Sequence, residues 1–480
     1  MLSLAVTCAA GLGMLAAGCS FAPEFTRPAL PVTDEYPADA PVPAAAKPEA
    51  RMAAEVAWRD YFADPQLQAM IAQALEHNRD LRVAVLRVLE ARATFQIRRA
   101  DQFPTLDVNA GELRVGVPDN AALANQGSTV SLYYAGASVP SWELDFWGRV
   151  RNLKGAALDQ FLASDAARRA ATVSLVAQVA DGYLSLRELD ERIVLARETI
   201  KTREESFRIF QRRFEVGNTT RLDVAQVETL LTQAQTLGAQ LEQARATQAH
   251  ALTLLVGTQP ARLSDRANLN DDALMHELRV GLPSDLLQQR PDIAAAEHRL
   301  RAANANIGAA RAAFFPTITL TGFGGVASSQ LDHLFESGSG TWLFWPQLTV
   351  PIFDAGKRQA NLDLAKVRRD AAVADYELTV QKAFREVADA LSAQRWLAEQ
   401  VAIQRRALAA QQDRARLAQM RYDRGSATYL EVLDAQRDLL STEQALVQLR
   451  RALMSSRVSL YAALGGGSQH YGKPPESTAR

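Results

Sequence analysis

The sequence predicts a mainly α-helical protein that also carries membrane β-strands, with both kinds of element built from an internal duplication. Three observations lead to this fold class. Motifs of the first half return about 210 residues later, a spacing typical of whole domains. Each half contains a proline-free helical stretch of about 67 residues, or roughly 100 Å of helix. Each half also contains two alternating segments of about ten residues, the length of a tilted membrane strand.

The duplication is evident from motifs that occur once in each half. Arg213-Phe214-Glu215-Val216-Gly217 returns as Arg421-Tyr422-Asp423-Arg424-Gly425, and Phe103-Pro104-Thr105-Leu106 returns as Phe315-Pro316-Thr317-Ile318. Solenoid repeats would recur every 20–50 residues or so, which is far shorter than this separation. Each half must therefore build the same substructure, and the two halves imply pseudo-symmetry.

Composition excludes several classes of function. The chain has 480 residues, 48% of them hydrophobic, and its 53 basic residues balance 54 acidic ones. This balance gives no support to a nucleic-acid partner. The only cysteines are Cys8 and Cys19, so the body has no disulfide and no thiolate chemistry. The six histidines are scattered without metal-ligand spacing, and neither a cofactor nor a metal is expected.

The N-terminus reads as a secretory signal. An apolar run over 2–17 leads to Ala16-Ala17-Gly18-Cys19, a pattern typical of a bacterial lipobox. We expect residues 1–18 to be a signal peptide and Cys19 to be acylated, with an extended proline-rich arm over 19–57. A plain cleaved signal peptide is the alternative.

Four strands are expected. They cover 105–117, 128–144, 317–327 and 342–353. A change of alternation at Gly111-Glu112 suggests a bulge there, and Pro346 is expected at a bulge or near an interface. A soluble β-sandwich edge is the alternative. Because four strands cannot close a membrane barrel and open edges are excluded from lipid, membrane strands here would require several chains to share one barrel.

The helices define the rest of each half. Long helices are expected over 149–216 and 357–424, with shorter ones over 64–100, 220–256 and 428–464. Asp64-Pro65 is a helix start signal. An ordinary coiled-coil dimer is the alternative, although it would not need the strands. The expected divisions are a first repeat over 58–257, an equatorial linker over 258–282, a second repeat over 283–465 and a disordered tail over 466–480.

Each long helix must reverse at a glycine. Gly217 and Gly425 stand at these turns, and glycine adopts positive φ at a helix C-terminus without steric strain. Hydroxyl residues that can cap the returning helix follow each one, at 219–220 and at 426–428. The two turns are therefore expected to be the tips of helical hairpins.

The central motifs resemble a known family. Gly281-Leu282-Pro283-Ser284-Asp285-Leu286-Leu287, Arg290-Pro291-Asp292-Ile293 and Pro351-Ile352-Phe353-Asp354-Ala355-Gly356 look like the signature of the TolC-like outer-membrane factor family, lipoprotein branch. The resemblance covers the chain from Cys19 to about Gly466. It implies a homotrimer with a shared 12-stranded outer-membrane β-barrel and a 12-helix periplasmic α-barrel.

The resemblance also implies a function. The chain would be a channel rather than an enzyme, passing small toxic compounds or drugs out of a Gram-negative bacterium. Its partners would be a periplasmic adaptor protein, an inner-membrane RND-type transporter and outer-membrane lipid. The alternative within this class is a channel for type I protein secretion. Alternatives from other classes are an adhesive surface trimer and a hydrolase that uses paired carboxylates.

Candidate gate residues follow from the resemblance. Glu431 and Asp434 match the acidic positions that ring the closed periplasmic entrance in the family, although a solvated helix face is the alternative for both. Tyr422 and Asp223 match a tyrosine–acid latch. The family's latch arginine falls at Ala427, so Arg424 or Arg221 would have to replace it. Gly217 and Gly425, with the residues after them, would be the turns where adaptor hairpins dock.

Overall fold

A computed structural model of the chain describes residues 20–29, 31–33, 35–37, 52–116, 129–259, 278 and 285–471. The expected signal peptide, Cys19 and most of the expected equatorial linker lie outside these residues. The described chain forms two compact units. The strand unit lies within Met1–Ala29, Val88–Ser164 and Ala296–Tyr376, and the hairpin unit lies within Leu30–Arg87, Asp165–Ala295 and Glu377–Arg480.

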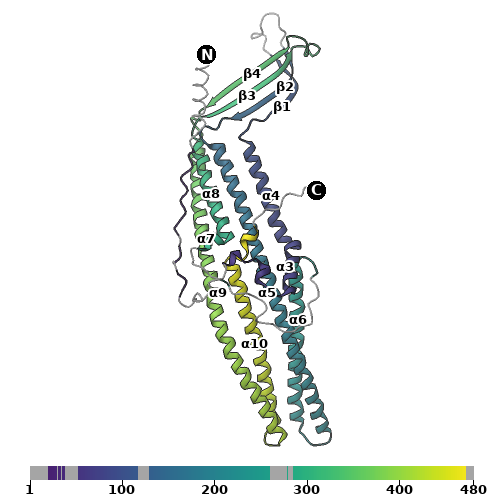
Figure 1. Cartoon of the computed structure of the whole chain (residues 1–480). Coiled ribbons are helices and arrows are strands. Elements are labelled where there is room, and N and C mark those ends of the chain that lie inside the picture. The colour runs from purple at the N-terminus through teal and green to yellow at the C-terminus, as the bar shows by residue number, and fades with distance from the viewer. Residues whose placement is uncertain are drawn as a thin grey trace. The chain divides into compact units, whose positions relative to one another are not determined.

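The strand unit contains one antiparallel sheet. Its strands are β1 (Asp107–Gly116), β2 (Thr129–Glu143), β3 (Thr317–Ser328) and β4 (Gly340–Thr349). They pair in the order β1-β2-β3-β4, so the second strand of the first repeat lies beside the first strand of the second repeat (Figure 1). The duplication is thus joined in the middle of the sheet, which leaves β1 and β4 as its two edges.

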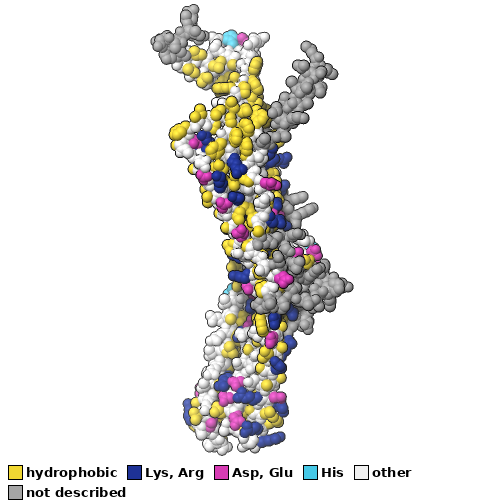
Figure 2. Space-filling model, turned by 90° about the vertical axis from the view of Figure 1, so that its left-hand side faces the viewer, with side chains coloured by type: hydrophobic (Ala, Val, Ile, Leu, Met, Phe, Trp, Pro, Cys, Tyr) yellow, Lys and Arg dark blue, Asp and Glu magenta, His cyan; other side chains and the backbone are white. Residues whose placement is uncertain are grey.

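The register gives the sheet two chemically different faces. Cross-strand partners share a face, so Val108, Ala137, Gly324 and Trp342 form one row. The face that contains this row carries a continuous apolar band, and hydrophobic side chains gather over the strands in Figure 2. Its members are Val108, Ala110, Ala135, Ala137, Val139, Trp142, Ile318, Leu320, Gly322, Gly324, Val326, Trp342, Phe344, Pro346 and Leu348.

The opposite face is largely polar. Opposite the apolar band it carries mainly hydroxyl, amide and carboxylate side chains with a few aromatic ones and Leu343, whereas beyond Gly111 it carries the aliphatic Leu113, Val115, Val130 and Leu132. Its members include Asp107, Asn109, Ser138, Glu143, Thr317, Thr319, Thr321, Phe323, Trp345, Gln347 and Thr349. On the apolar face the band ends at Ala110, because the next side chains of β1 on that face are Glu112 and Arg114, an ion pair of 2.6 Å.

Two expectations about the strands were wrong. The β1–β2 pairing runs in unbroken register through Gly111 and Glu112, so the apolar residues change face there without a bulge. The irregularity lies instead in β2, between Val139 and Trp142. Pro346 pairs in register with Leu320, so it is not at a bulge, and its position near an interface stays a prediction. The last strand ends at Thr349 rather than at 353, since Pro351 follows and has no N–H to donate to a sheet.

The hairpin unit is built around two helical hairpins (Figure 1). One joins α5 (Arg149–Glu215) to α6 (Arg221–Val256), and the other joins α9 (Lys357–Asp423) to α10 (Tyr429–Ala463). The long helices α5 and α9 have 67 residues each and begin in the strand unit. Within the first hairpin, Leu189 and Ile193 of α5 pack against Leu241 of α6. No helix among the described residues is both long and apolar enough to cross a bilayer.

The expected helix over 64–100 is broken. Asp64 and Pro65 begin it as predicted, because the Asp64 carboxylate accepts the N–H groups of Gln66 and Leu67. The helix stops at Asn78, however, which separates α3 (Pro65–His77) from α4 (Arg79–Ala100). The Asn78 side-chain carbonyl accepts the N–H of Leu81 at 2.8 Å and thereby restarts the chain as a new helix.

The second repeat has the same break. There α7 (Leu286–Gln289) and α8 (Pro291–Ala312) are separated at Arg290. In both repeats a glycine at the end of the short returning helix lies against the break. Gly257 has φ +77° and Gly465 has φ +76°. A Cβ atom on Gly257 would lie 2.4 Å from the carbonyl oxygen of His77, and one on Gly465 would lie 2.6 Å from that of Gln289.

Residues 53–61 pack against residues 461–471 in the hairpin unit. The rings of Tyr61 in α2 (Trp58–Tyr61) and Tyr461 stack with centroids 4.2 Å apart. Two short 3-10 helices, η1 (Ala53–Glu55) and η3 (Ser468–Tyr471), lie beside them, and Gly467 N–H donates to the carbonyl of Ala53 at 2.9 Å. The expectation of disorder from residue 466 was therefore wrong for 466–471. The segment is Gly-rich in sequence, but its backbone and the Ser468 side chain are hydrogen-bonded.

Candidate functional site at the helical hairpin turns

The two hairpin turns have the same backbone. Gly217 and Gly425 adopt φ of +79° and +71°, as the sequence predicts. The N–H of Gly217 donates to the carbonyl of Phe214 at 3.0 Å, and that of Gly425 donates to Tyr422 at 2.9 Å. The following residue in each turn donates back to the equivalent arginine, Arg213 or Arg421. These bonds satisfy the last carbonyls of each long helix and fix the direction of the turn.

The first turns of the returning helices differ. Thr220 and Asp223 form a capping box on α6, in which the threonine hydroxyl accepts the Asp223 N–H and the carboxylate accepts the Thr220 N–H at 3.0 Å. The Asp223 carboxylate also accepts the hydroxyls of Thr220 and Thr219, and these hydrogen bonds hold its pKa below the ordinary value. Thr428, the equivalent N-cap of α10, makes no side-chain cap bond. Asp223 is therefore engaged within its own turn.

An aromatic cluster joins the hairpins just above the turns. Tyr429 lies with its ring centroid 4.4 Å from that of Phe210 and 4.9 Å from that of Tyr422. Its hydroxyl donates to Ser206 at 2.7 Å, and burial raises its pKa. Buried aliphatic side chains of α6 and α10 complete the cluster, namely Val224, Val227 and Leu433. All four helices thus contribute to one apolar contact.

Tyr422 meets an arginine rather than the expected acid. Arg213 donates from Nη1 to the Tyr422 hydroxyl, and its guanidinium lies over the rings of Phe210 at 5.5 Å and Tyr422 at 6.0 Å. No hydrogen bond joins Tyr422 to Asp223 within the described chain. Neither Arg221 nor Arg424 forms an ion pair or side-chain hydrogen bond among these residues. The structure therefore brings Tyr422 to a partner that the sequence did not indicate.

The expected gate carboxylates are paired with arginines of the same chain. Glu431 lies 2.9 Å from Arg421, and Asp434 lies 3.3 Å from Arg437. Asp438, one turn further along α10, was not anticipated. It accepts from Arg414 at 2.6 Å, and this bond, followed by that from Arg437, lowers its pKa. The three acids share one helix face because they are three and four residues apart, a spacing that could have indicated Asp438.

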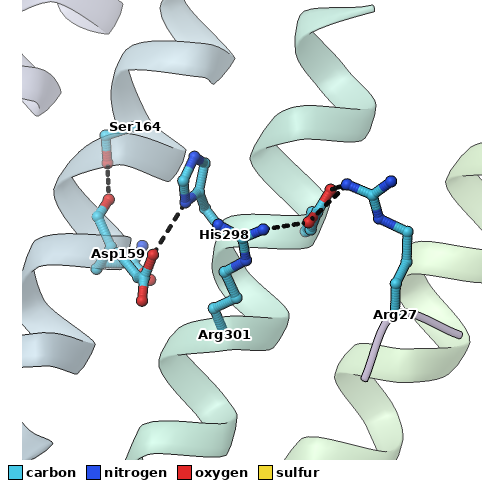
Figure 3. A network of polar contacts seen from close by, with 7 residues as sticks. Arg27, Asp159, Ser164, His298 and Arg301 are labelled. Atoms are coloured by element: carbon cyan, nitrogen blue, oxygen red, sulfur yellow. Dashed lines mark hydrogen bonds and ion pairs between the residues drawn. The ribbon is translucent and has the colours of Figure 1, made fainter. Parts of the chain in front are cut away.

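A second assembly of polar contacts lies in the strand unit. Residues 20–29, which follow Cys19, are held on α8 rather than free. Arg27 and Arg301 both pair with the Glu297 carboxylate, at 2.9 Å and 2.6 Å. Figure 3 shows the two arginines reaching one carboxylate. Beside it, the His298 ring of α8 lies 2.9 Å from the Asp159 carboxylate of α5 (Figure 3).

The start of this arm is seated by an aromatic stack. The Phe21 ring lies 4.5 Å from that of Phe315, which lies 5.1 Å from that of Trp147. A Cβ atom on Gly308 would lie 2.7 Å from the Ala22 nitrogen, so the close approach of the arm to α8 requires glycine. Cys19 itself lies outside the described residues, and its acylation stays a prediction. Among the residues that the structure does describe, no cluster of three His, Cys, Asp or Glu side chains could hold a metal ion.

Comparison with known proteins places these features in a family. The model of the outer membrane efflux protein family matches residues 70–258 and 282–466, one match for each repeat. The toluene efflux pump outer membrane protein TtgC of Pseudomonas putida is 44% identical over 468 residues, covering 97% of this chain and 95% of the relative. OprJ, an outer membrane protein of Pseudomonas aeruginosa, is 41% identical over 450 residues and covers 94% and 93%.

Solved structures agree. The crystal structure of the open state of the MtrE outer membrane channel of Neisseria gonorrhoeae is similar with a TM-score of 0.84 and 38% identity, covering 94% of this chain and 98% of that one. The TolC-like fold class and the outer-membrane location with a periplasmic extension, both predicted from the sequence, are thereby confirmed. The chain belongs to the outer membrane efflux protein family and is an outer-membrane channel of efflux systems.

Proposed function

We propose that three copies of this chain form the exit duct of a tripartite efflux pump. Each copy would lend four strands to one 12-stranded barrel and its helices to one 12-helix periplasmic tube. The observation that carries this proposal is the sheet, in which one face has a continuous apolar band while the opposite face of that band is mostly polar. Alternation of this kind suits a wall between lipid and a water-filled bore. The two edges, β1 and β4, would pair with neighbouring copies.

The partners proposed are a periplasmic adaptor protein and an inner-membrane RND-type transporter. The adaptor would dock at the turns around Gly217 and Gly425, which are exposed. Compounds passed outward would be small and toxic, and the similarity to TtgC, a toluene efflux pump outer membrane protein, supports that substrate class. We also propose that residues 1–18 are a signal peptide and that Cys19 is acylated. The chain would then divide into a first repeat over 58–257, a linker over 258–282 and a second repeat over 283–465.

The closed entrance is proposed to lie at the hairpin turns. Glu431 and Asp434 would face their counterparts in the other two copies, with Tyr422 and Asp223 near the same turns. Arg421 and Arg437 of the same chain pair with these two carboxylates and reduce the net negative charge that the three copies would bring together. The barrier to ions at the entrance would therefore be partly steric.

The test combines assembly and conductance. The purified full-length protein is expected to sediment as a trimer and to give single channels in planar lipid bilayers. Replacing Glu431 and Asp434 with Ala is expected to increase conductance of the closed channel several-fold, whereas Glu443→Ala, further along α10, serves as the matched control. A monomer without channels would contradict the duct, and channels unaffected by the double replacement would remove these residues from the gate.

A further inference from the structure

We propose that a cavity in the strand unit binds small amphiphilic anions, and organic carboxylates in particular. The cavity has a volume of about 530 Å³ and lies between α5, α8 and α9 (Figure 1). Every residue that lines it belongs to the strand unit. The binding is inferred from the cavity alone, whereas its place on the inner side of the duct wall rests on the proposed function.

The lining is positively charged, and no carboxylate is among the described residues that form it. Each helix contributes one arginine, namely Arg149 of α5, Arg299 of α8 and Arg368 of α9. Three side-chain amides also line the cavity, those of Gln160, Asn306 and Asn361. The rest of the lining is alanine and leucine. Hydrogen-bond donors and an apolar surface therefore meet in one place, which suits a ligand with a charged end and an apolar body.

Two of the three arginines have no partner within the described chain. Arg149 is held by the Glu143 carboxylate, to which its Nε donates at 2.8 Å. Arg299 and Arg368, by contrast, are exposed and form no ion pair or side-chain hydrogen bond among the described residues. A guanidinium group can donate two parallel hydrogen bonds to one carboxylate. Arg299 and Arg368 can therefore bind an anion without first breaking a contact in the protein.

Acidic side chains on the same helices are paired with other basic residues. Asp159 of α5 lies 2.9 Å from His298, and Asp363 of α9 lies 3.4 Å from Lys366. Glu297 of α8 is occupied by the two arginines described above. None of these three acids lines the cavity. An anion that enters from solution is therefore the partner that the guanidinium groups of the cavity lack.

Helix α8 carries the cavity and the arm of residues 20–29 on opposite faces. Asn304 donates to the carbonyl of Pro23 at 2.7 Å, and Gly308 lies against Ala22. The cavity side begins at Arg299 and repeats every three or four residues along α8. At 3.6 residues per turn, the two sets point roughly half a turn apart. In the proposed duct the arm leads to lipid and runs outside the tube, so the cavity would face the bore.

An organic carboxylate fits this cavity better than a bare inorganic anion does. Its volume lies within the range of about 300–1,000 Å³ that is usual for small-molecule sites. The carboxylate would lie between Arg299 and Arg368, and an apolar body would cover alanines such as Ala310. Inorganic phosphate would leave that apolar surface in water and would gain nothing from it.

The experiment is equilibrium dialysis of the full-length protein in detergent against cinnamate, with protein-free micelles subtracted. Saturable binding at one site per chain is expected. Arg299→Gln and Arg368→Gln are each expected to raise the Kd about tenfold, because each removes hydrogen bonds to a charged group. Arg92→Gln is the matched control, since Arg92 is exposed on α4, which does not line the cavity. Ala310→Leu, which fills the apolar part without changing the charge, is expected to weaken binding several-fold.

Two further ligands test the chemical class. Cinnamylamine has the same apolar skeleton with a cationic end, and it is expected to bind at least tenfold more weakly than cinnamate. Equal binding of the two, or equal binding by the two glutamine variants in correctly assembled protein, would overturn the proposal. Displacement of cinnamate by an equal concentration of inorganic phosphate would show a site for bare anions and would overturn the amphiphilic class.

Conductance separates this site from the function on which its place in the bore rests. Cinnamate is expected to lower the single-channel current of the unmodified protein in planar bilayers, and the double variant Arg299→Gln with Arg368→Gln should not be blocked. Binding in dialysis without any block, in channels that still conduct, would overturn the position in the bore. Binding that persisted in protein that forms no channels would count against the duct and support the site.

Discussion

Arg290 donates a hydrogen bond from Nη1 to the carbonyl oxygen of Ala463 at 2.8 Å, two residues before the glycine that ends the second repeat. In the first repeat Asn78 donates from Nδ2 to the carbonyl of Leu255, also at 2.8 Å and also two residues before the closing glycine. Both donors lie at the break between two consecutive helices, α3 and α4 in the first repeat and α7 and α8 in the second. The duplication has therefore preserved the contact while the donor changed from a neutral amide to a buried cation.

The first prediction concerns that cation. Arg290 is 7% exposed and bonds Asp292 through two nitrogens as well as Ala463, with Glu386 at 2.8 Å. The single ammonium group of lysine cannot make the paired hydrogen bonds to Asp292 together with the bond to Ala463. Arg290→Lys is therefore expected to lower the free energy of unfolding by about 2–3 kcal/mol. Denaturant unfolding followed by circular dichroism measures the change. Arg299→Lys, on the exposed side of α8, should change the free energy of unfolding by less than about 0.5 kcal/mol. Equal effects of the two replacements would contradict the stabilising role of Arg290.

The second prediction concerns the closing glycines. Gly257→Ala and Gly465→Ala each place a Cβ atom against a backbone carbonyl at a positive φ. Each is expected to destabilise the protein by at least about 2 kcal/mol, through strain and steric overlap. Gly155→Ala is the control, because a Cβ there meets nothing within 4 Å and lies inside α5. The free energy of unfolding of that variant is expected to rise by about 0.5–1 kcal/mol, because alanine favours a helix more than glycine does. Thermal unfolding of the three variants checks the opposite signs.

The third prediction is a pH dependence at the first turn of α6. The capping bonds depress the pKa of Asp223, so their stabilisation is fully present above the ordinary aspartate pKa of about 4 and is lost as the pH falls through the lower folded value. Amide exchange in this turn, corrected for intrinsic rates, should accelerate only below that range. Asp223→Ala should show accelerated exchange at neutral pH, about fivefold for a cap worth about 1 kcal/mol. Exchange that stayed flat with pH in the unmodified chain would argue against the capping box.

The fourth prediction concerns the seating of residues 20–29. Gly308→Val puts a side chain where Ala22 lies, and Phe21→Ala removes the stack on Phe315. Phe21→Ala is expected to raise deuterium uptake in this arm about fivefold, because a stacked aromatic pair contributes about 1 kcal/mol beyond its burial. Gly308→Val is expected to raise uptake at least as much, because the added side chain displaces the arm from α8. Uptake in the hairpin turns, which belong to the other unit, should not change. An arm that exchanges freely before any substitution would show that these contacts do not hold it.

The fifth prediction compares the two faces of β4. Phe344→Arg charges the apolar face and is expected to destabilise the inserted sheet by about 2–4 kcal/mol in each copy, reducing the amount of trimer in outer-membrane fractions. Gln347→Arg adds the same side chain to the polar face of the same strand and should be tolerated. If the yields of the two variants were reversed, the faces would have been assigned the wrong way round.

Much of the fold could be predicted from the sequence because the features that specify its helices and turns are local. Absence of proline, a glycine at each turn and Asp64-Pro65 at a helix start all act through the backbone of a few residues. The break at Asn78 was missed because asparagine is compatible with a helix, and only its bonds to Leu81 and Leu255 reveal the interruption. The order of residues 466–471 was missed because it depends on partners about 400 residues away, such as Ala53.

The candidate site was readable in part. Helical spacing places Glu431 and Asp434 on one face, and the glycines mark the turns. The partner of Tyr422 was not readable, because arginines at several nearby positions compete and sequence spacing cannot say which one points across to the other hairpin. The role of Asp223 in the gate stays a prediction, but its engagement in its own turn was not anticipated. A carboxylate three residues after a threonine can cap its own helix, and in this chain it does.

The extra residue in β2 has a consequence for how the gene can change. Val139 pairs with Gly322 and Trp142 with Leu320, so three steps along one strand match two along its neighbour. Both side chains lie on the apolar face because the irregularity between them absorbs the odd residue. Deleting Ser141 would place two steps of β2 opposite two steps of β3 and would leave Trp142 opposite Leu320 on the same face, whereas a one-residue deletion in the regularly paired part of the strand would turn the following side chains to the other face. The bulge therefore lets this strand change its length by one residue without exchanging its two faces.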